Sequence, residues 1–585
     1  MSRSRPTRKQ ETLPARDYHA TVVNPDDGIE IAITVMQPAL AAGERAPLIL
    51  HGHGFGGTRL TDREQPSVYE SLSGGPLPSS EAARRAANAG YFVISFDQRG
   101  FGESGGHVHI MDPDIEGGDI SAILDWAEHD MAHGDRLARR DGRLVAGALG
   151  LSYGGGFQMI GAAVDSRFAA IVPTATWHDL RYSLAPDNVV KTAWGSGLVA
   201  LGLPTSGMDL DPIMYHALLQ GLASPLTGRG VSDRVAQRLY DHSPASFFDA
   251  DAAHEAERVD PRPERGPPRV DALILQGVGD TLFNLNEGVA SANALRAAGN
   301  DVHLVAMRHG HSLPFLEDID RIAYQTDAHL DWGDQRVETA AFELAWLDWK
   351  LKGEAPRTDF PHTLVILDDD TQLAMDELPV ARERTLEFEG QAATGGLDLL
   401  KGVFRENTLG GLWHLVAETS SKATELVKRW LDSDPDGRVE HDTALLAKLV
   451  NALPADRVDE LASGGVFLPV QTIADDNQAL IGLPTVEIDV KGGGPSPVAF
   501  VGIGIQRPGV SSTLLVNKQL RPIRGAGRRT LELNGIATRV YEGDTVGLLV
   551  YGYHPQYLAS FSALPGHINV EGRLGLPLVA LPGSA

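Results

Sequence analysis

The sequence of 585 residues contains no cysteine. This absence excludes disulfide bonds, a thiol nucleophile, iron–sulfur clusters and zinc sites with thiolate ligands. The sequence also lacks any run of about 18 uninterrupted apolar residues, so we predict no membrane-spanning helix. The basic N-terminus is not followed by an apolar segment, and we expect no Sec-type signal. We therefore expect a cytoplasmic protein.

Positive charge is in deficit. Lysine and arginine total 51 against 77 aspartates and glutamates, which gives a formal net charge of −26. Such a surface repels phosphate backbones and anionic lipid, so we expect neither a nucleic-acid partner nor a membrane partner. Hydrophobic residues make up 42% and charged residues 22%, which is typical of a globular protein. This composition is compatible with a homo-oligomer.

The first part of the chain alternates short apolar runs with helical patterns. After a predicted pair of strands at 18–23 and 28–36, the apolar runs fall at 47–50, 91–96, 143–149, 168–172, 271–276 and 301–307. Buried strands that alternate with amphipathic helices predict a parallel α/β sheet. The alternation stops between about 176 and 269, where the pattern is helical and loop-rich. We interpret this segment as a helical cap inserted into the sheet domain. The last predicted element of the sheet domain is a helix over 339–352.

From about residue 355 the pattern changes to short alternating runs separated by glycine and proline. These runs fall at 498–505, 512–516, 529–533 and 545–551 and predict an all-β sandwich or barrel. A helical pattern over about 397–462 interrupts them, and the sequence assigns it no role. The predicted division is a flexible tail (1–17), an α/β domain (18–178 and 269–354), a cap (179–268) and a β domain (355–585).

The pentapeptide Gly150-Leu-Ser-Tyr-Gly154 has the G-x-S-x-G pattern of a nucleophilic serine. It directly follows the predicted strand 143–149 and opens a predicted helix over 155–164. A serine at a sharp strand-to-helix turn exposes its hydroxyl, and the flanking glycines remove side chains that would collide. The helix N-terminus also favours negative charge that develops beside it. We therefore predict that Ser152 is a catalytic nucleophile.

A nucleophilic serine needs a base, and the base needs an acid to orient it. In α/β-hydrolases the chain order is serine, acid, histidine. Asp280 follows the predicted strand 271–276, and His311 follows the predicted strand 301–307, so both fit this order. We predict Asp280 as the acid and His311 as the base, with His309 as the rival base.

The oxyanion of an acyl-transfer reaction needs two backbone N–H donors. One is expected from the residue after the nucleophile, Tyr153, and the other from the glycine-rich loop after the early strand 47–50. In that loop we predict Phe55 as the donor, with His53 as the alternative. Three aromatic residues at the start of the cap are candidates for binding the substrate, although each can equally be part of the cap core: Trp177, Trp194 and Tyr182.

Three His-x-His pairs, at 51/53, 107/109 and 309/311, raise the question of a metal, because imidazole pairs bind zinc. No H-E-x-x-H spacing accompanies them. The glycine-rich segment Asp97-Gln-Arg-Gly-Phe-Gly-Glu-Ser-Gly-Gly106 has neither the phosphate-loop pattern nor the dinucleotide pattern. It predicts a turn that supports the nucleophile loop. We expect no metal and no cofactor.

At these residues the chain resembles the α/β-hydrolases of the peptidase S15 group, which includes X-prolyl dipeptidyl peptidases, cocaine esterase and α-amino-acid ester hydrolases. The resemblance is carried by Gly150-Leu-Ser-Tyr-Gly-Gly155, by the turn at 97–105 and by Trp346-Leu-Asp-Trp-Lys-Leu-Lys-Gly353. Segments 517–525 and 566–578 resemble the jelly-roll domain of that family. The resemblance implies an α/β-hydrolase sheet, a helical cap and a C-terminal all-β jelly roll.

The resemblance also implies a nucleophile, an acid and a base at Ser152, Asp280 and His311. One departure from the family is notable, because several members place a tyrosine hydroxyl in the oxyanion hole. In this chain Phe55 occupies that place and can offer only its backbone N–H.

These residues predict a serine hydrolase that cleaves a small-molecule ester, an amide or a short peptide through an acyl-enzyme. An X-Pro-type dipeptidyl aminopeptidase is an alternative, and it would need an acidic clamp for the substrate's ammonium group. Asp179 and Asp187 are candidates for the clamp, although either can simply be a solvated carboxylate. A non-catalytic binding protein on a hydrolase scaffold is the third hypothesis, and the competent residues at all three triad positions argue against it.

Overall fold

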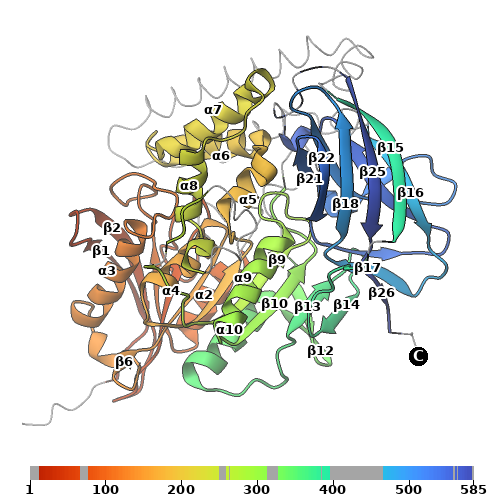
Figure 1. Ribbon diagram of the computed structural model, residues 1–585. Coiled ribbons are helices and arrows are strands. Elements are labelled where there is room, and N and C mark those ends of the chain that lie inside the picture. The colour runs from red at the N-terminus through yellow and green to blue at the C-terminus, as the bar shows by residue number, and fades with distance from the viewer. Residues whose placement is uncertain are drawn as a thin grey trace, which may run out of the picture.

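The computed structural model describes most of the chain (Figure 1). The described residues are 12–65, 77–248, 259–262, 264–312, 327–383, 385–394, 465–557, 560, 562, 564 and 566–582. The helical pattern predicted over 397–462 and most of the predicted tail lie outside these residues. Within them, no helix has the length and the apolar character needed to cross a membrane.

A mixed sheet of ten strands forms the centre of the first half of the chain, in the order β1-β2-β4-β3-β7-β8-β9-β10-β13-β14. The seven strands from β4 to β13 run parallel, and β1, β2 and β14 are antiparallel to their neighbours. In chain order the strands are β1 (Arg16–Val23), β2 (Glu30–Gln37), β3 (Leu48–Gly52), β4 (Phe92–Phe96), β7 (Ala146–Leu151), β8 (Phe168–Thr174), β9 (Asp271–Gly277), β10 (Val302–Met307), β13 (Thr363–Ile366) and β14 (Gln372–Met375).

Helices cover both faces of this sheet, because its strands are apolar on both sides. Along β3, Leu48 and Leu50 belong to the core on one face, and Ile49 belongs to the core on the other. The first face is covered by α3 (Glu116–His129), α4 (Tyr153–Val164) and α9 (Leu285–Ala297). The second face is covered by α2 (Pro78–Asn88) and α10 (Thr339–Leu347).

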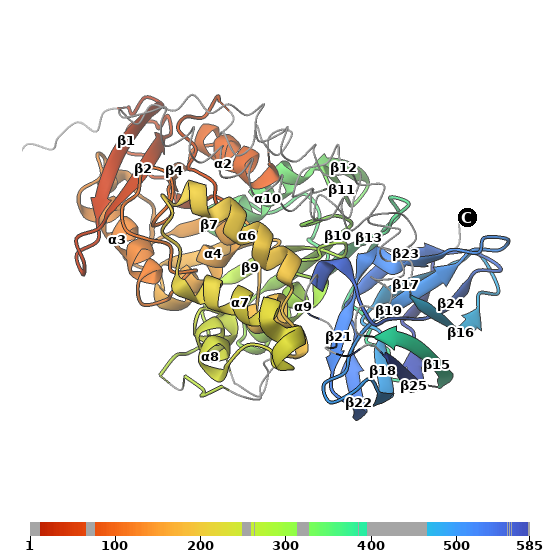
Figure 2. The same ribbon diagram turned by 90° about the horizontal axis from the view of Figure 1, so that it is seen from above.

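The segment between β8 and β9 is helical, as the sequence predicts, and its described residues contain no strand. It consists of α5 (Leu180–Leu184), α6 (Thr192–Thr205), α7 (Pro212–Thr227), α8 (Asp233–Asp241) and the short 3-10 turns Pro186–Asn188 and Pro244–Phe247. Side-chain caps begin three of these helices: Asp179 caps α5, Asp211 caps α7 and Ser232 caps α8. Figure 2 shows α6 and α7 lying across the end of the central sheet.

The C-terminal region is all-β within its described residues. One sheet has the order β15-β25-β18-β22, and a second contains β16, β24 and β19, with β20 and β21 both paired to β19. The strands are β15 (Leu386–Thr394), β16 (Val466–Thr472), β18 (Thr485–Gly492), β19 (Val498–Gln506), β20 (Thr513–Leu515), β21 (Arg521–Arg524), β22 (Gly527–Glu532), β24 (Thr545–Tyr551) and β25 (Gly566–Gly575). Side chains from both sheets share one apolar core.

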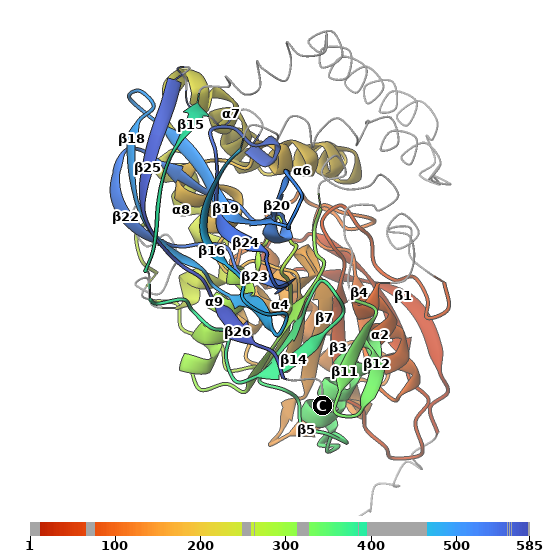
Figure 3. The same cartoon turned by 90° about the vertical axis from the view of Figure 1, so that its right-hand side faces the viewer.

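A third small sheet joins the C-terminal region to the central sheet. It contains β23 (Ile536–Val540), β17 (Gln478–Gly482) and β26 (Leu578–Ala580). Ala479 and Ile481 of β17 pack in one cluster with Val365 of β13. Figure 3 shows β26 of this small sheet lying beside β14.

Three local features differ from the sequence-based expectation. The apolar run at 143–149 is divided, because β6 (Arg143–Leu144) forms a hairpin with β5 (Arg139–Arg140) and only β7 enters the central sheet. The helix expected over 339–352 changes at Asp348 into a π-turn (Asp348–Lys352) that ends at Gly353, whose φ is 77°. A hairpin of β11 (His329–Trp332) and β12 (Gln335–Glu338) was not predicted.

The buried carboxyl group of Glu343 on α10 makes the stability of the core depend on pH. Its side chain is fully buried, and neither carboxylate oxygen has a hydrogen-bond partner among the described residues. Burial raises its pKa from 4.5 to about 8. Because the unfolded chain releases this proton near pH 4.5 and the folded protein near pH 8, stability falls as the pH rises across that window. The cost above pH 8 is up to about 5 kcal/mol.

We therefore expect Glu343→Gln to melt at a higher temperature than the wild type at pH 8.5, with the gap closing toward pH 5. Thermal unfolding measured at several pH values tests this expectation. The matched control is Glu389→Gln, because Glu389 is exposed on β15 and its replacement should leave the pH dependence unchanged. A gap that stays constant from pH 5 to pH 8.5 would contradict the assignment.

Candidate active site

Ser152 lies at the sharp turn between β7 and α4. Its backbone has φ 58° and ψ −118°, a strained conformation that residues other than glycine rarely adopt. The flanking glycines are required by space: a Cβ on Gly150 or on Gly154 would collide with the carbonyl oxygen of Gly52 on the neighbouring strand. The sequence-based prediction of a strand–serine–helix turn therefore agrees with the backbone.

Two backbone N–H groups are available close to this turn. Tyr153 is the first residue of α4, so its N–H has no acceptor within the helix. Phe55 lies in the loop after β3, and within the described residues its N–H donates to no backbone or side-chain oxygen. The rings of Phe55 and Tyr153 pack edge to face with centroids 5.5 Å apart. The two predicted oxyanion residues are therefore neighbours.

His311 and Asp280 form a buried pair. The His311 Nδ1 lies 2.7 Å from the Asp280 Oδ2, and both side chains are less than a tenth exposed. The Asp280 Oδ1 accepts hydrogen bonds from the backbone N–H groups of Leu282 and Phe283, at 2.9 and 2.7 Å. Because an ionised carboxylate only accepts hydrogen bonds, the proton of the His311 ring lies on Nδ1 and Nε2 is left as an acceptor. This is the tautomer that a general base requires.

The strand topology brings these groups to one edge of the sheet. Ser152 follows β7, Asp280 follows β9 and His311 follows β10, and these strands are parallel. The carboxyl ends of parallel strands meet at the same edge, which is where ligands bind in open α/β sheets. The ring of Phe55 reaches the same edge from the loop after β3, and a Cβ on Gly202 of α6 would touch it, so α6 covers this loop.

Of the two candidate bases, His311 is the one whose ring contacts Asp280. The carbonyl of His309 lies against Gly277, where there is no space for a Cβ. Among the described residues, no group of three or more His, Asp or Glu side chains is arranged to hold a metal ion.

The two histidines of the loop after β3 are part of its internal hydrogen bonding. The Nδ1 of His53 donates to the Gly54 carbonyl, and its Nε2 accepts from the backbone N–H of Gln98. His51 lies between the hydroxyls of Ser95 and Ser80. Burial lowers the pKa of both histidines, that of His51 to about 3, so both are neutral at physiological pH.

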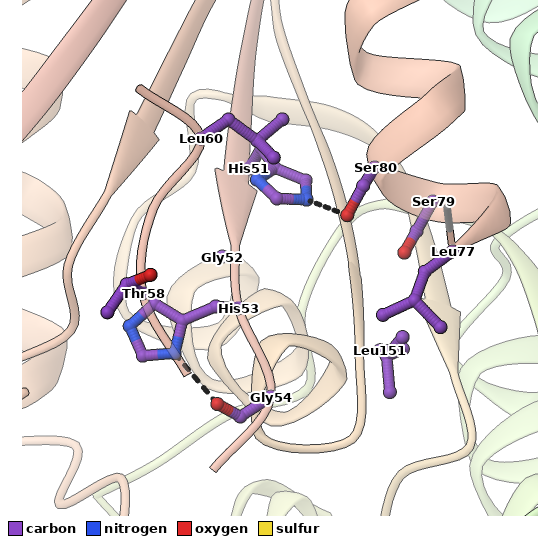
Figure 4. Close-up of a pocket in the computed structure, with 10 residues that line it drawn as sticks. All are labelled: His51, Gly52, His53, Gly54, Thr58, Leu60, Leu77, Ser79, Ser80 and Leu151. Atoms are coloured by element: carbon purple, nitrogen blue, oxygen red, sulfur yellow. Dashed lines mark hydrogen bonds between the residues drawn. The ribbon is translucent and has the colours of Figure 1, made fainter. Parts of the chain in front are cut away.

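A small pocket opens beside this loop, next to Leu151 and so one residue from Ser152 (Figure 4). His53 and Thr58 lie on one side of it, and Leu77 and Ser79 lie on the other. Its position between the loop after β3 and the start of α2 places it against the backbone of the nucleophile turn.

The glycine-rich turn at 97–106 was expected to support the nucleophile loop, and Phe101 of the turn packs edge to face on Tyr153 of that loop, with ring centroids 6.0 Å apart. The turn also contacts the loop after β3. Asp97 accepts from the backbone N–H of Arg59 and forms an ion pair with the Arg59 side chain. Gln98 donates through Nε2 to the His53 carbonyl at 2.6 Å. The turn therefore holds the loop after β3, which carries Phe55, because β4 is the neighbour of β3 in the sheet.

The three aromatic residues predicted to bind the substrate have different environments. Trp194 donates from Nε1 to the Thr281 hydroxyl, and its ring lies 6.1 Å from that of His311. Trp177 packs on Tyr153 at 6.1 Å. Tyr182 is fully buried, and its hydroxyl donates to Asn534 of the C-terminal region at 3.2 Å, so its hydroxyl is used inside the protein.

Phe283 was missed from the sequence. Its ring lies 5.4 Å from both His311 and Trp177. It stands three residues after Asp280, so its place on the loop of the predicted acid was a usable signal.

Lys191 and Glu116 were also missed. The Lys191 ammonium is buried and donates to the carbonyls of Thr281 and Leu282, and burial lowers its pKa to about 8. The Glu116 carboxylate accepts from the Tyr153 hydroxyl at 2.9 Å, and burial raises its pKa to about 8. Each contacts a segment far away in the sequence, so no local pattern predicts it.

The two carboxylates considered for an ammonium clamp are used internally. Asp179 is fully buried, caps α5 and forms an ion pair with Arg181 at 2.6 Å. Asp187 accepts from the backbone N–H of Arg524 at 2.5 Å and lies 3.5 Å from Arg529. Neither is the freely solvated carboxylate that the sequence suggested as the simpler alternative.

The fold and the serine turn define the class: this is an α/β-hydrolase. Residues 27–312, close to half of the chain, match the family model described as X-Pro dipeptidyl-peptidase (S15 family). Over these residues the chain matches the peptidase S15 family of α/β-hydrolases, as the sequence motifs predicted.

Solved structures share the architecture over nearly the whole chain. A CocE/NonD family hydrolase from Staphylococcus aureus aligns over 97% of both chains with a TM-score of 0.55 and 12% identity. An aminopeptidase from a Thaumarchaeota archaeon aligns over 99% of this chain and 98% of its own, with a TM-score of 0.55 and 13% identity. An α-amino-acid ester hydrolase aligns over 97% of its own chain and 96% of this one, with a TM-score of 0.54 and 12% identity. At these identities the likeness concerns the fold.

A curated relative is an uncharacterized 31.7 kDa protein from Escherichia coli, which is 32% identical over 150 residues. The match covers 26% of this chain, and the chain spans 43% of the length of that relative.

Proposed function

We propose that this protein is a serine hydrolase that cleaves a carboxylic ester or amide through an acyl-enzyme. In this mechanism the Ser152 hydroxyl attacks the carbonyl carbon while the His311 Nε2 takes its proton. Asp280 holds the imidazolium that forms, and the N–H groups of Tyr153 and Phe55 bind the oxyanion. His311 then passes the proton to the leaving group. Water attacks the acyl-enzyme by the reverse sequence and releases the acid.

The observation that carries this proposal is the strained backbone of Ser152 at the same sheet edge as the His311–Asp280 pair. Strain of this kind persists only where the surrounding structure imposes it, and it is typical of functional sites. A merely structural glycine-rich turn would not need a serine in this conformation, since glycine adopts it without strain.

The aromatic surroundings favour an apolar acyl group. Phe283, Trp194 and Trp177 lie around the His311 side of the site, and Phe55 lies on the oxyanion side. The two carboxylates considered for an ammonium clamp are already engaged by arginines or by backbone N–H groups. An ester or amide with an uncharged acyl group therefore suits the site better than the free N-terminus of a dipeptidyl substrate does.

Labelling with a fluorophosphonate probe tests the proposal. We expect the wild type to be labelled on the peptide that contains Ser152, as located by mass spectrometry, and Ser152→Ala to remain unlabelled. Equal labelling of both proteins, or labelling of another serine, would overturn the assignment. A panel that pairs a short-chain nitrophenyl ester with a dipeptidyl-proline anilide then separates the ester substrate from the peptide substrate.

We also propose the finer architecture predicted from the sequence, an α/β domain (18–178 and 269–354), a cap (179–268) and a C-terminal jelly-roll domain, with one change of boundary. The predicted boundary at 354/355 falls too early, because β13 and β14 (363–375) belong to the central sheet and the jelly roll begins after them. The two antiparallel sheets that share one core support the jelly roll. The helical run between β8 and β9 supports the cap.

A further inference from the structure

The loop that carries Asp280 is held from outside the α/β domain by the side chain of Gln519. Gln519 lies in the C-terminal region, 239 residues further along the chain, and its Nε2 donates to the backbone carbonyls of Val278 and Asp280 at 2.9 and 3.0 Å. These two carbonyls flank the turn by which the loop leaves β9. The Gln519 amide therefore ties the backbone on both sides of this turn to the C-terminal region.

The orientation of this amide is set by two further residues. Nε2 of Gln519 faces a third carbonyl as well, that of Asn517 at 3.3 Å. Because Nε2 faces only acceptors, the Gln519 Oε1 faces the Nδ2 of Asn534, which donates to it at 3.0 Å. The Asn534 Oδ1 in turn accepts from the Tyr182 hydroxyl at 3.2 Å. We call this chain of hydrogen bonds, from Tyr182 through Asn534 and Gln519 to the Asp280 loop, the relay. Its donors and acceptors are consistent in this one direction only.

The relay is shielded from solvent along its whole length. Tyr182 and Asp280 are 0% exposed, Gln519 is 3% exposed and Asn534 is 7% exposed. A buried amide that loses its partner has little water to replace it, so each member depends on the next. The relay also joins the three parts of the molecule, since Tyr182 belongs to α5 of the cap and Asn534 and Gln519 belong to the C-terminal region.

We propose that Gln519, Asn534 and Tyr182 are positioning residues that hold Asp280 in register with His311, so that the cap and the C-terminal region both contribute to catalysis. This inference rests on the proposed serine-hydrolase function. None of the three touches the reacting atoms, and each acts through the backbone of the Asp280 loop. Tyr182, which the sequence suggested for the substrate, has its hydroxyl in this relay instead.

The expected effect is large because catalytic hydrogen bonds are sensitive to small displacements. A misplacement of about 1 Å can cost about 100-fold in rate. In this site the Asp280–His311 contact is 2.7 Å long, and the same carboxylate holds the loop through Leu282 and Phe283. A shift of the backbone at Asp280 therefore moves the carboxylate end of that contact relative to His311.

The test is steady-state kinetics of Gln519→Leu on a nitrophenyl ester that the wild type hydrolyses. Leucine keeps much of the side chain's bulk and removes both donations, and we expect kcat to fall by about 10- to 100-fold with KM changed less than threefold. The acid limb of the pH profile of kcat/KM should also move to lower pH, because a displaced Asp280 stabilises the His311 imidazolium less. A purely structural role would lower the melting temperature without moving that limb.

Asn534→Asp provides a second, nearly isosteric test. It keeps the acceptor for Tyr182 but sets an oxygen against the Gln519 Oε1, which favours turning the Gln519 amide away from the two carbonyls. We expect the same loss of kcat as in Gln519→Leu. The double variant should be no worse than either single variant, because residues in one hydrogen-bond network are not additive.

Gln37→Leu is the matched control. Gln37 is 3% exposed, lies on β2 at the far side of the central sheet from β9 and donates to the Pro14 carbonyl rather than to the Asp280 loop. Its replacement should leave kcat within about threefold of the wild type. Unchanged kcat and pH profile in a folded Gln519→Leu or Asn534→Asp would overturn the relay. Failure of the wild type to react with the fluorophosphonate probe would instead overturn the proposed function.

Discussion

Ser152→Ala is expected to lower kcat on an ester substrate by about a million-fold, the loss typical of removing a serine nucleophile. Without the hydroxyl no acyl-enzyme can form, and His311 has no proton to accept. The two backbone donors of Tyr153 and Phe55 remain in place, so a residual rate about 10³- to 10⁴-fold above that in water is expected. Initial rates at high enzyme concentration, corrected for spontaneous hydrolysis, measure the loss.

A buried serine that takes no part in the chemistry gives the control. Ser291 lies in α9, and its hydroxyl is 3.2 Å from the His178 ring. Ser291→Ala should retain kcat within about fivefold of the wild type. If Ser152→Ala also retained turnover at that level, with its fold intact by circular dichroism, the nucleophile would have to lie elsewhere.

The nucleophile turn could be predicted from the sequence because all of its determinants are local. Gly150 and Gly154 must be glycine because a Cβ at either position would collide with the carbonyl oxygen of Gly52. The apolar strand and the helix lie on either side of Ser152. The order of Asp280 and His311 follows from the parallel strands that precede them. Local pattern and chain order therefore sufficed to predict that these three residues follow parallel strands at one edge of the sheet.

The surroundings of the site could not be predicted in the same way, because they depend on contacts across hundreds of residues. Tyr182 was assigned to a substrate pocket, yet its hydroxyl bonds to Asn534, 352 positions away. Gln519 and Lys191 reach the Asp280 loop from two other parts of the chain. No periodicity or motif records such contacts, since each needs only one suitable side chain at a place that the tertiary fold decides.

Asp280→Asn is expected to lower kcat by about 10⁴-fold while leaving the fold intact. The direction of the new amide is fixed by its neighbours. The backbone N–H groups of Leu282 and Phe283 donate to the Asp280 Oδ1, so the amide oxygen of the variant must stay there. Its NH₂ group must then face the Nδ1 of His311, which becomes an acceptor.

With Nδ1 accepting a hydrogen bond, the proton of the neutral His311 ring moves to Nε2, and this nitrogen can no longer take the proton of Ser152. The variant therefore keeps every contact of the loop but holds the base in the wrong tautomer. Asp544→Asn is the matched control, because Asp544 is also fully buried and accepts hydrogen bonds from Arg507 and from the Tyr541 N–H, far from the site. If kcat fell equally in both variants, the loss would reflect a buried charge in general, and Asp280 would not be the acid of the triad.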